Sequence, residues 1–269
     1  MLAFTFHPQR SLKLRLFFYL LIFSLSCHAQ MEGIDKLDNS PSELSNEAIS
    51  TLFRQHIQQV DSLSHTAGIA NDFARIYTAS MKNINIQLKD MDSIAQTFIK
   101  KFEISFIGYF LDACVEFEKN GRLSQEAVWN CYFSHPNARP WQLTLIGVNA
   151  HINGDIWKGL VKNFSAEEIS RYKKNLLSFQ TSISKAFQPF FDDLMTQSSY
   201  LRFINGFTKG SAKWYGEWLI YNWRLRQIDL AILYFHDKEK FRKKLAIVDR
   251  KRHKIDRVIL SKGKRARTG

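Results

Sequence analysis

The stretch WQLTLIGVNAHINGDI, residues 141–156, decides the fold. On a helical wheel its apolar side chains cover most of the circumference, and Gly147, Ala150 and Gly154 form a strip of small residues along it. A helix that is apolar nearly all round lies inside a domain rather than on its surface. We therefore expect a central helix against which other helices pack, with the small residues allowing one neighbour to approach closely.

Helical patterns continue on both sides of this segment. With 5 Pro and 12 Gly among 269 residues, the chain has too few turn-forming residues for a β fold. Apolar residues recur at steps of three and four, as Phe98, Phe102 and Phe106 do in a long helix expected over residues 92–119. The pattern predicts an all-α fold, a single helical-bundle-like domain of about seven helices.

Capping residues set the limits of the next helices. The central helix should run over residues 140–163, because a proline suits its first turn. Ser165 and Glu168 form a capping-box pattern, so a further helix begins there and extends to about residue 187. Pro189 should bend or break that helix.

The N-terminus has the pattern of a secretory signal peptide. Basic residues precede an apolar run at 16–25, and Cys27 and Ala29 occupy the small-residue positions of a cleavage site. We expect residues 1–29 to be removed and the protein to be exported to the periplasm or the outside. Two alternatives stay open: a lipid anchor on Cys27, because Leu25-Ser26-Cys27 resembles a lipoprotein box, and retention as an uncleaved anchor.

The remaining chain divides into three parts. Residues 30–41 are polar and form a flexible lead-in, residues 42–237 form the helical domain, and residues 238–269 form a basic C-terminal helix followed by a disordered tail. After removal of the signal peptide two cysteines remain, Cys114 and Cys131. They either pair in an oxidising compartment or stay as free thiols, and the sequence leaves both open.

Charge is concentrated at the two ends. The net charge is +13, yet 14 basic against 3 acidic residues lie from residue 238 onward, and residues 30–237 are close to neutral. A global basic charge therefore does not indicate nucleic acid, and we expect no nucleic-acid partner. The basic end is either a solvated tail or a contact for an anionic surface such as lipid. Within the body, Arg224 could serve an anionic ligand or pair with an acidic residue.

Four polar side chains lie on the central helix that should be buried. His151 and Asp155 are four residues apart and share one face, and Asn149 and Asn153 share another. Burying such groups without partners costs a few kcal/mol each, so something must pair them.

Three interpretations of these residues stay open. The first is a structural hydrogen-bond network between helices. The second is a site for a divalent metal, in which Asp112 and Glu116 on the preceding helix add a similar pair to His151 and Asp155. The third is a metal-free general base, His151 oriented by Asp155, although no nucleophile is identifiable.

The segment Gly147-Val-Asn-Ala-His-Ile-Asn-Gly-Asp155 resembles the signature of an uncharacterised bacterial family, a domain of unknown function with a Gly-x-Asn-Ala-His-Ile-x-x-Asp core. The resemblance covers about residues 70–235; it implies an all-helical domain and no established activity. His151-Ile-Asn-Gly-Asp-Ile156 is also similar to a segment of the zinc-dependent phospholipase C and single-strand nuclease superfamily. That superfamily has further His residues close behind, where this chain has Trp157, Lys158 and Gly159.

Two functions follow from these observations. One is an exported, metal-assisted hydrolase that acts on a lipid or other cell-envelope substrate through His151 and Asp155. The alternative is a non-catalytic envelope protein in which Asn149, His151, Asn153 and Asp155 form a structural network.

Overall fold

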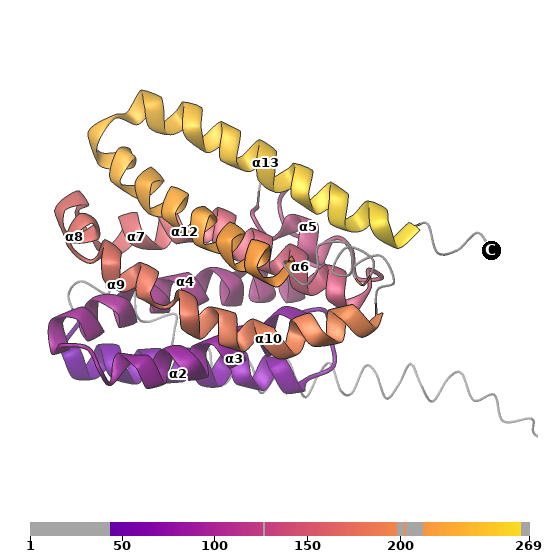
Figure 1. Ribbon diagram of the computed structural model, residues 1–269, viewed down its shortest axis with the longest axis horizontal. Helices are drawn as coiled ribbons and strands as arrows, with labels where there is room; N and C mark the ends of the chain where they lie inside the picture. Colours follow the sequence, from indigo (N-terminus) through magenta and orange to yellow (C-terminus); the bar gives the residue numbers. More distant parts are fainter. Residues whose placement is uncertain (1–43, 126, 198–201, 203–211, 265–269) are drawn as a thin grey trace, which may run out of the picture. The chain divides into compact units, whose positions relative to one another are not determined.

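The computed structural model describes residues 44–125, 127–197, 202 and 212–264, which belong to one compact unit that begins at Leu44 (Figure 1). Every regular element in these ranges is helical, so the predicted all-α fold is confirmed. The elements are α2 (Asn46–His65), α3 (Asn71–Leu88), α4 (Ser93–Asn120), α5 (Asn130–Phe133), α6 (Pro140–Ala150), the π-helical turn η2 (His151–Asp155), α7 (Ile156–Asn163), α8 (Ala166–Arg171), α9 (Lys173–Ser178), α10 (Gln180–Gln197), α12 (Ala212–His236) and α13 (Lys238–Lys264). Within the same ranges, none of these helices combines the length and the apolar character that crossing a membrane requires.

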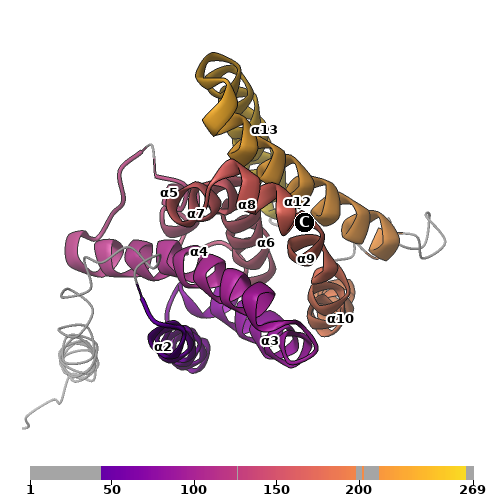
Figure 2. The same cartoon turned by 90° about the vertical axis from the view of Figure 1, so that its left-hand side faces the viewer.

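The central helix is present and continuous through α6, η2 and α7. It contacts α3 and α4 on one side and α12 and α13 on the other, and Figure 2 shows α6 and α7 between these two groups. The predicted strip of small residues explains the close packing. A Cβ atom added to Gly147 would lie 2.7 Å from the ring of Phe73, and one added to Gly154 would collide with Val128. Only glycine fits at these two positions without displacing a neighbour.

The long helix α4 has the ends that its sequence predicts. The Asp92 carboxylate accepts hydrogen bonds from the backbone N–H groups of Ile94 and Ala95, which caps the first turn. Gly121 ends the helix in the left-handed conformation with φ 67°. Between these caps, Phe102, Glu103 and Phe106 are all buried, so α4 brings one acidic side chain into the interior.

The segment after the central helix differs from its prediction. The capping box of Ser165 and Glu168 is confirmed, but the single helix expected to residue 187 is divided into α8, α9 and α10. The breaks occur at Tyr172, which packs on Phe98 with ring centroids 4.5 Å apart, and at the buried Phe179. At these two breaks the chain packs one partly buried and one buried ring against the rest of the domain. Pro189, where we expected the bend or break, lies within α10.

The basic C-terminal helix belongs to the packed structure. The sequence placed the end of the domain at residue 237, whereas α13 packs against α12, α6 and η2. Phe241, Arg252 and Asp256 of α13 are buried, and these inward-facing residues are what tie the helix to the domain. The predicted signal peptide, the lead-in, Cys27 and the end of the tail lie outside the described residues. No disulfide joins Cys114 to Cys131.

Candidate functional site

A π-helical turn stands at the middle of the central helix. η2 covers His151–Asp155, the same five residues that carry three of the four polar side chains singled out in the sequence. A single π-turn inside an α-helix is rare and often occurs at a functional site, because it changes the direction in which side chains leave the helix. Here the four polar residues separate into two pairs with different surroundings.

The asparagine pair faces α12 and α13. Asn149 Nδ2 donates to the Arg252 carbonyl at 2.9 Å and to Asp256 Oδ1 at 2.7 Å. Asn153 Nδ2 donates to Asn149 Oδ1 at 2.9 Å, and Gln227 Nε2 donates to the Asn153 carbonyl at 3.0 Å. This pair therefore joins three helices through a chain of buried hydrogen bonds.

The His151 and Asp155 pair faces the other side. Asp155, 1% exposed, accepts a hydrogen bond of 2.9 Å from Trp129 Nε1 at Oδ2. His151 Nδ1 lies 3.8 Å from the same oxygen, which is too long for a hydrogen bond, and Lys158 Nζ lies 3.7 Å from Oδ1. His151 is 4% exposed, and neither of its ring nitrogens has a hydrogen-bond partner among the described residues.

Aromatic rings surround His151. Its ring stacks on Phe106 with centroids 3.4 Å apart, and the edges of Tyr77 and Phe73 meet it with centroids at 4.6 and 5.3 Å. Burial lowers the pKa of His151, an effect that the neighbouring Asp155 carboxylate opposes only in part. His151 is therefore neutral near pH 7, with one ring nitrogen able to donate and the other to accept a hydrogen bond.

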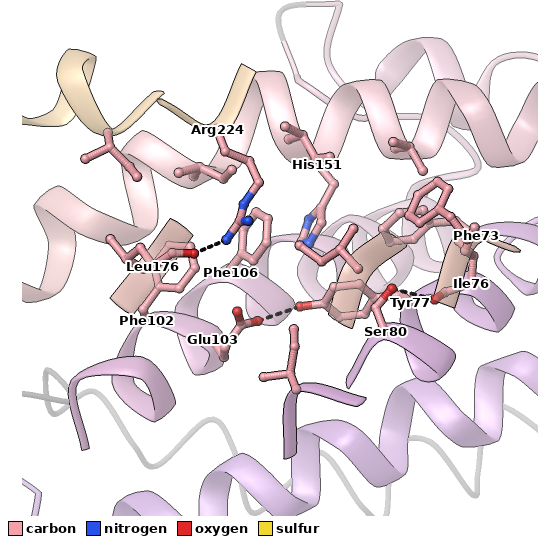
Figure 3. A pocket seen from close by; sticks show the side chains of 17 residues that line it. Phe73, Ile76, Tyr77, Ser80, Phe102, Glu103, Phe106, His151, Leu176 and Arg224 are labelled. Atoms are coloured by element: carbon pink, nitrogen blue, oxygen red, sulfur yellow. Dashed lines mark hydrogen bonds between the residues drawn. The ribbon is translucent and has the colours of Figure 1, made fainter. Parts of the chain in front are cut away.

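A cavity opens beside this histidine (Figure 3). The space between its lining atoms amounts to about 680 Å³, part of it continuous with solvent, and the centre of a water molecule can move through about 60 Å³ of it. Its walls come from α3, α4, the central helix, α9, α10 and α12 and are mostly aliphatic and aromatic. Four side chains provide its main polar groups: Tyr77, Glu103, His151 and Arg224.

Glu103 is a site residue that the sequence analysis missed. Tyr77 donates its hydroxyl hydrogen to Glu103 Oε2 at 3.1 Å. Burial raises the pKa of Glu103 to about 7, against the opposing effects of the Tyr77 hydrogen bond and the Arg224 charge. The signal that could have found it is a lone acid in the run Phe102-Glu103-Ile104-Ser105-Phe106, on a helix whose apolar stripe was already evident.

Arg224 lies at the same end of the cavity as Glu103 (Figure 3). It is 8% exposed and donates to the Leu176 carbonyl. Burial lowers the pKa of Arg224 to about 10, with the Glu103 charge acting in the opposite direction, so the guanidinium stays charged near pH 7. The acidic residue whose charge acts on the pKa of Arg224 is Glu103.

The four predicted metal ligands are not brought together. Asp112 and Glu116 are exposed on α4, whereas His151 and Asp155 are buried. Across the part of the chain that the structure describes, no three His, Cys, Asp or Glu side chains form a group able to hold a metal ion. The reason is helix geometry: six residues separate Asp112 from Phe106, which stacks on His151, and at 100° per residue this turns Asp112 roughly 120° away.

These features define an all-helical domain with a mainly apolar interior cavity beside a buried His–Asp pair. The chain belongs to the DUF5995 family, a family of unknown function, whose model matches residues 50–262. The predicted membership of an uncharacterised family is thus confirmed, over a longer range than the 70–235 expected. The match does not bear on the proposed core motif or on the likeness to zinc-dependent phospholipases. No curated protein and no solved structure matches the chain.

Proposed function

We propose that this domain binds a small, mainly apolar molecule in the cavity, and that His151 forms a hydrogen bond with a polar group of that molecule. The observation that carries the proposal is a buried histidine at the cavity wall, 4% exposed, whose two ring nitrogens have no partner among the described residues. An unpaired buried polar group costs about 1–3 kcal/mol, a cost that a bound ligand would remove.

The cavity has the character of a small-molecule site. Ligand sites typically enclose roughly 300–1,000 Å³ and have apolar walls with a few polar groups that fix orientation. The space of about 680 Å³, with Phe and Ile side chains around Tyr77, Glu103, His151 and Arg224, fits that description. An acyl chain or another apolar group of similar width suits such walls, in keeping with the lipid or envelope partner expected from the sequence.

Hydrolysis of such a molecule is the narrower form of this proposal. A neutral His151 with Asp155 on one side could act as a general base toward a substrate held on its other side. The separation of 3.8 Å between His151 Nδ1 and Asp155 Oδ2 would have to close when substrate binds. A metal-assisted version would need ligands beyond these two, and the described residues provide no group of three. We therefore favour binding, with metal-free acid–base chemistry as the catalytic alternative.

The asparagine pair supports a second, structural role on the same helix. The hydrogen bonds of Asn149 and Asn153 all go to α12, α13 or each other, away from the cavity. We propose that these two residues fix helix packing, as in the non-catalytic alternative, and take no part in ligand binding.

Location and surface contact remain proposals from the sequence. Export rests on the signal-peptide pattern of residues 1–29 and would bring the domain close to envelope lipids. Contact of α13 with an anionic surface is supported by its exposed basic residues, among them Lys244, Arg250, Lys251 and Lys254. At roughly 1 kcal/mol per residue near an anionic membrane, several such residues would suffice for reversible association.

A matched pair of tryptophan variants tests the binding proposal. N-phenylnaphthylamine, a neutral dye that fluoresces in apolar surroundings, serves as the ligand. Ile183→Trp replaces an aliphatic side chain at the cavity wall with a bulkier indole ring, and Ile247→Trp makes the same change on the exposed face of α13. We expect the dye to bind the unmodified chain and the Ile247 variant alike, and the Ile183 variant at least tenfold more weakly. No dye binding by the unmodified chain, or equal binding by all three proteins, would overturn the proposal.

A further inference from the structure

The charged groups of the cavity are few and lie at one end. Arg224 and Glu103 face each other across that end, and each alters the pKa of the other through its charge (Figure 3). Tyr77 from α3 donates a hydrogen bond to Glu103, and the ring of His151 from η2 packs against Tyr77. Among the described residues, α9 and α10 contribute Leu176, Ile183 and Phe187 to the lining. Asp155 does not line the cavity: it accepts a hydrogen bond from Trp129, and His151 Nδ1 and Lys158 Nζ lie 3.8 and 3.7 Å from its two oxygens.

The net charge of the cavity near neutral pH follows from these groups. Arg224 is charged, because its lowered pKa is still about 10. His151 is neutral, because burial lowers its pKa from 6.5. Glu103, with a pKa of about 7, changes from neutral to negative in this range. The charges of the described lining residues thus sum to a positive value at slightly acidic pH and to zero at slightly alkaline pH.

A buried guanidinium in apolar walls is a strong site for an anion. The cost of removing the charge from water is offset when an oppositely charged group shares the site, and the planar fork of Arg matches carboxylate, sulfonate and phosphate oxygens. A protonated Glu103 adds an O–H donor beside it, whereas an ionised Glu103 would repel the anion. The remaining walls accept only apolar groups.

We infer that the ligand of this cavity is an anionic amphiphile, with its negative group between Arg224 and the protonated Glu103 and its apolar body along the Phe and Ile walls toward His151. This inference rests on the proposed function and adds the chemical class of the ligand. It has a consequence for pH: binding should be tightest when Glu103 carries its proton. A carboxyl of pKa about 7 is protonated in roughly ten of eleven molecules at pH 6 and one of eleven at pH 8, so affinity should fall about tenfold.

Two dyes that differ by one charge separate this inference from the proposed function. Anilinonaphthalene sulfonate is the permanently anionic counterpart of N-phenylnaphthylamine, and its charge is constant between pH 6 and pH 8. We expect the anionic dye to bind the full chain about tenfold more tightly at pH 6 than at pH 8, and the neutral dye equally at both. If the neutral dye binds and the anionic dye shows neither preference nor pH dependence, this inference fails and the proposed function stands. If neither dye binds, both fail.

Variants assign the effect to its residues. Glu103→Gln should make binding of the anionic dye independent of pH. Arg224→Met should weaken the anionic dye at least tenfold and change the neutral dye less than twofold. Arg250→Met, an exposed position on α13, is the matched control for dye that adheres to surface cations and should change neither. Should the Arg224 variant fail to fold, the unmodified chain and the Glu103 variant still decide the question, because a pH dependence that survives in Glu103→Gln overturns the inference.

Discussion

The two polar pairs of the central helix are equally buried but differently satisfied. Asn149 donates to two groups of α13 and Asn153 donates to Asn149, all at 2.7–2.9 Å, whereas both ring nitrogens of His151 have no partner among the described residues. Both pairs lie within seven residues of one helix, so neither sequence position nor burial distinguishes them. The difference teaches that the partners of a buried polar group, and not its burial, indicate whether it holds the fold together or awaits a ligand.

This contrast extends to the energetics of the two sides. On the α13 side, the hydrogen bonds of Asn149 and Asn153 contribute to stability, although Gln227 Oε1 and Arg252 Nε on that side have no partner among the described residues. On the cavity side, an unpaired His151 and a Glu103 whose pKa is raised by burial to about 7 both reduce it. Functional sites are commonly the less stable parts of a domain, because groups arranged for a ligand are not arranged for one another. Measurements of the free energy of unfolding can therefore test whether the α13 side holds the fold together and the cavity side serves a ligand.

The largest effect should come from Asn149→Leu. The change removes one hydrogen-bond donor from the buried Asp256 carboxylate and from the Arg252 carbonyl, and it removes the acceptor of the Asn153 amide. Because breaking a buried network around a charge is costly, we expect the free energy of unfolding to fall by about 4 kcal/mol, measured by urea denaturation. Asn85→Leu on the exposed face of α3 is the control and should change it by about 0.5 kcal/mol or less. A loss below about 1 kcal/mol for Asn149→Leu would remove the structural role of the pair.

Glu103 should make stability depend on pH. Its folded pKa of about 7 lies above the ordinary value of 4.5, so the folded protein holds the proton more tightly than the unfolded chain. Its contribution is fully present below about pH 4.5 and is lost as pH rises to about 7, a loss of about 3 kcal/mol. We compare the free energy of unfolding of Glu103→Gln with that of the unmodified chain. This difference should favour the variant by about 3 kcal/mol more at pH 8 than at pH 4. Glu116→Gln, exposed on the same helix, should follow the unmodified chain in denaturation curves at both pH values.

Substitution of a glycine on the central helix tests how closely a neighbouring segment packs against it. Gly154→Ala directs a methyl group into Val128, and we expect it to lower the free energy of unfolding by about 2 kcal/mol. In a double-mutant cycle, Val128→Ala should recover part of this loss, because it removes the colliding methyl groups. Gly108→Ala in α4, where nothing lies within 4 Å, should be neutral or slightly stabilising. Equal effects at Gly154 and Gly108 would contradict the close approach.

Much of the fold could be predicted from the sequence, because the signals are local. The apolar circumference of residues 141–156, the caps at Asp92 and Gly121 and the capping box at Ser165 depend on neighbouring residues alone. The break at Tyr172 could not be predicted, since it depends on a ring packing against Phe98, seventy-four positions earlier in the chain.

The site was predictable only in part. His151 and Asp155 were found because a polar pair on an apolar helix is visible in the sequence. Their assignment with Asp112 and Glu116 required knowing which side of α4 faces inward, and the buried acid proved to be Glu103. Partners such as Trp129 and Arg224 come from distant segments, so only the fold reveals them.

The smallest stability effect should come from His151→Leu, although His151 is as buried as Asn149. Replacing an imidazole without hydrogen bonds by an apolar side chain of similar size removes an unpaired group rather than a bond. Asp155 keeps its hydrogen bond from Trp129 and the nearby Lys158 charge, so no new buried charge is left alone. We expect the free energy of unfolding to change by less than about 1 kcal/mol in urea titrations at pH 7. A loss near that of Asn149→Leu would show that His151 belongs to the structural network, and the contrast between the two sides of the helix would disappear.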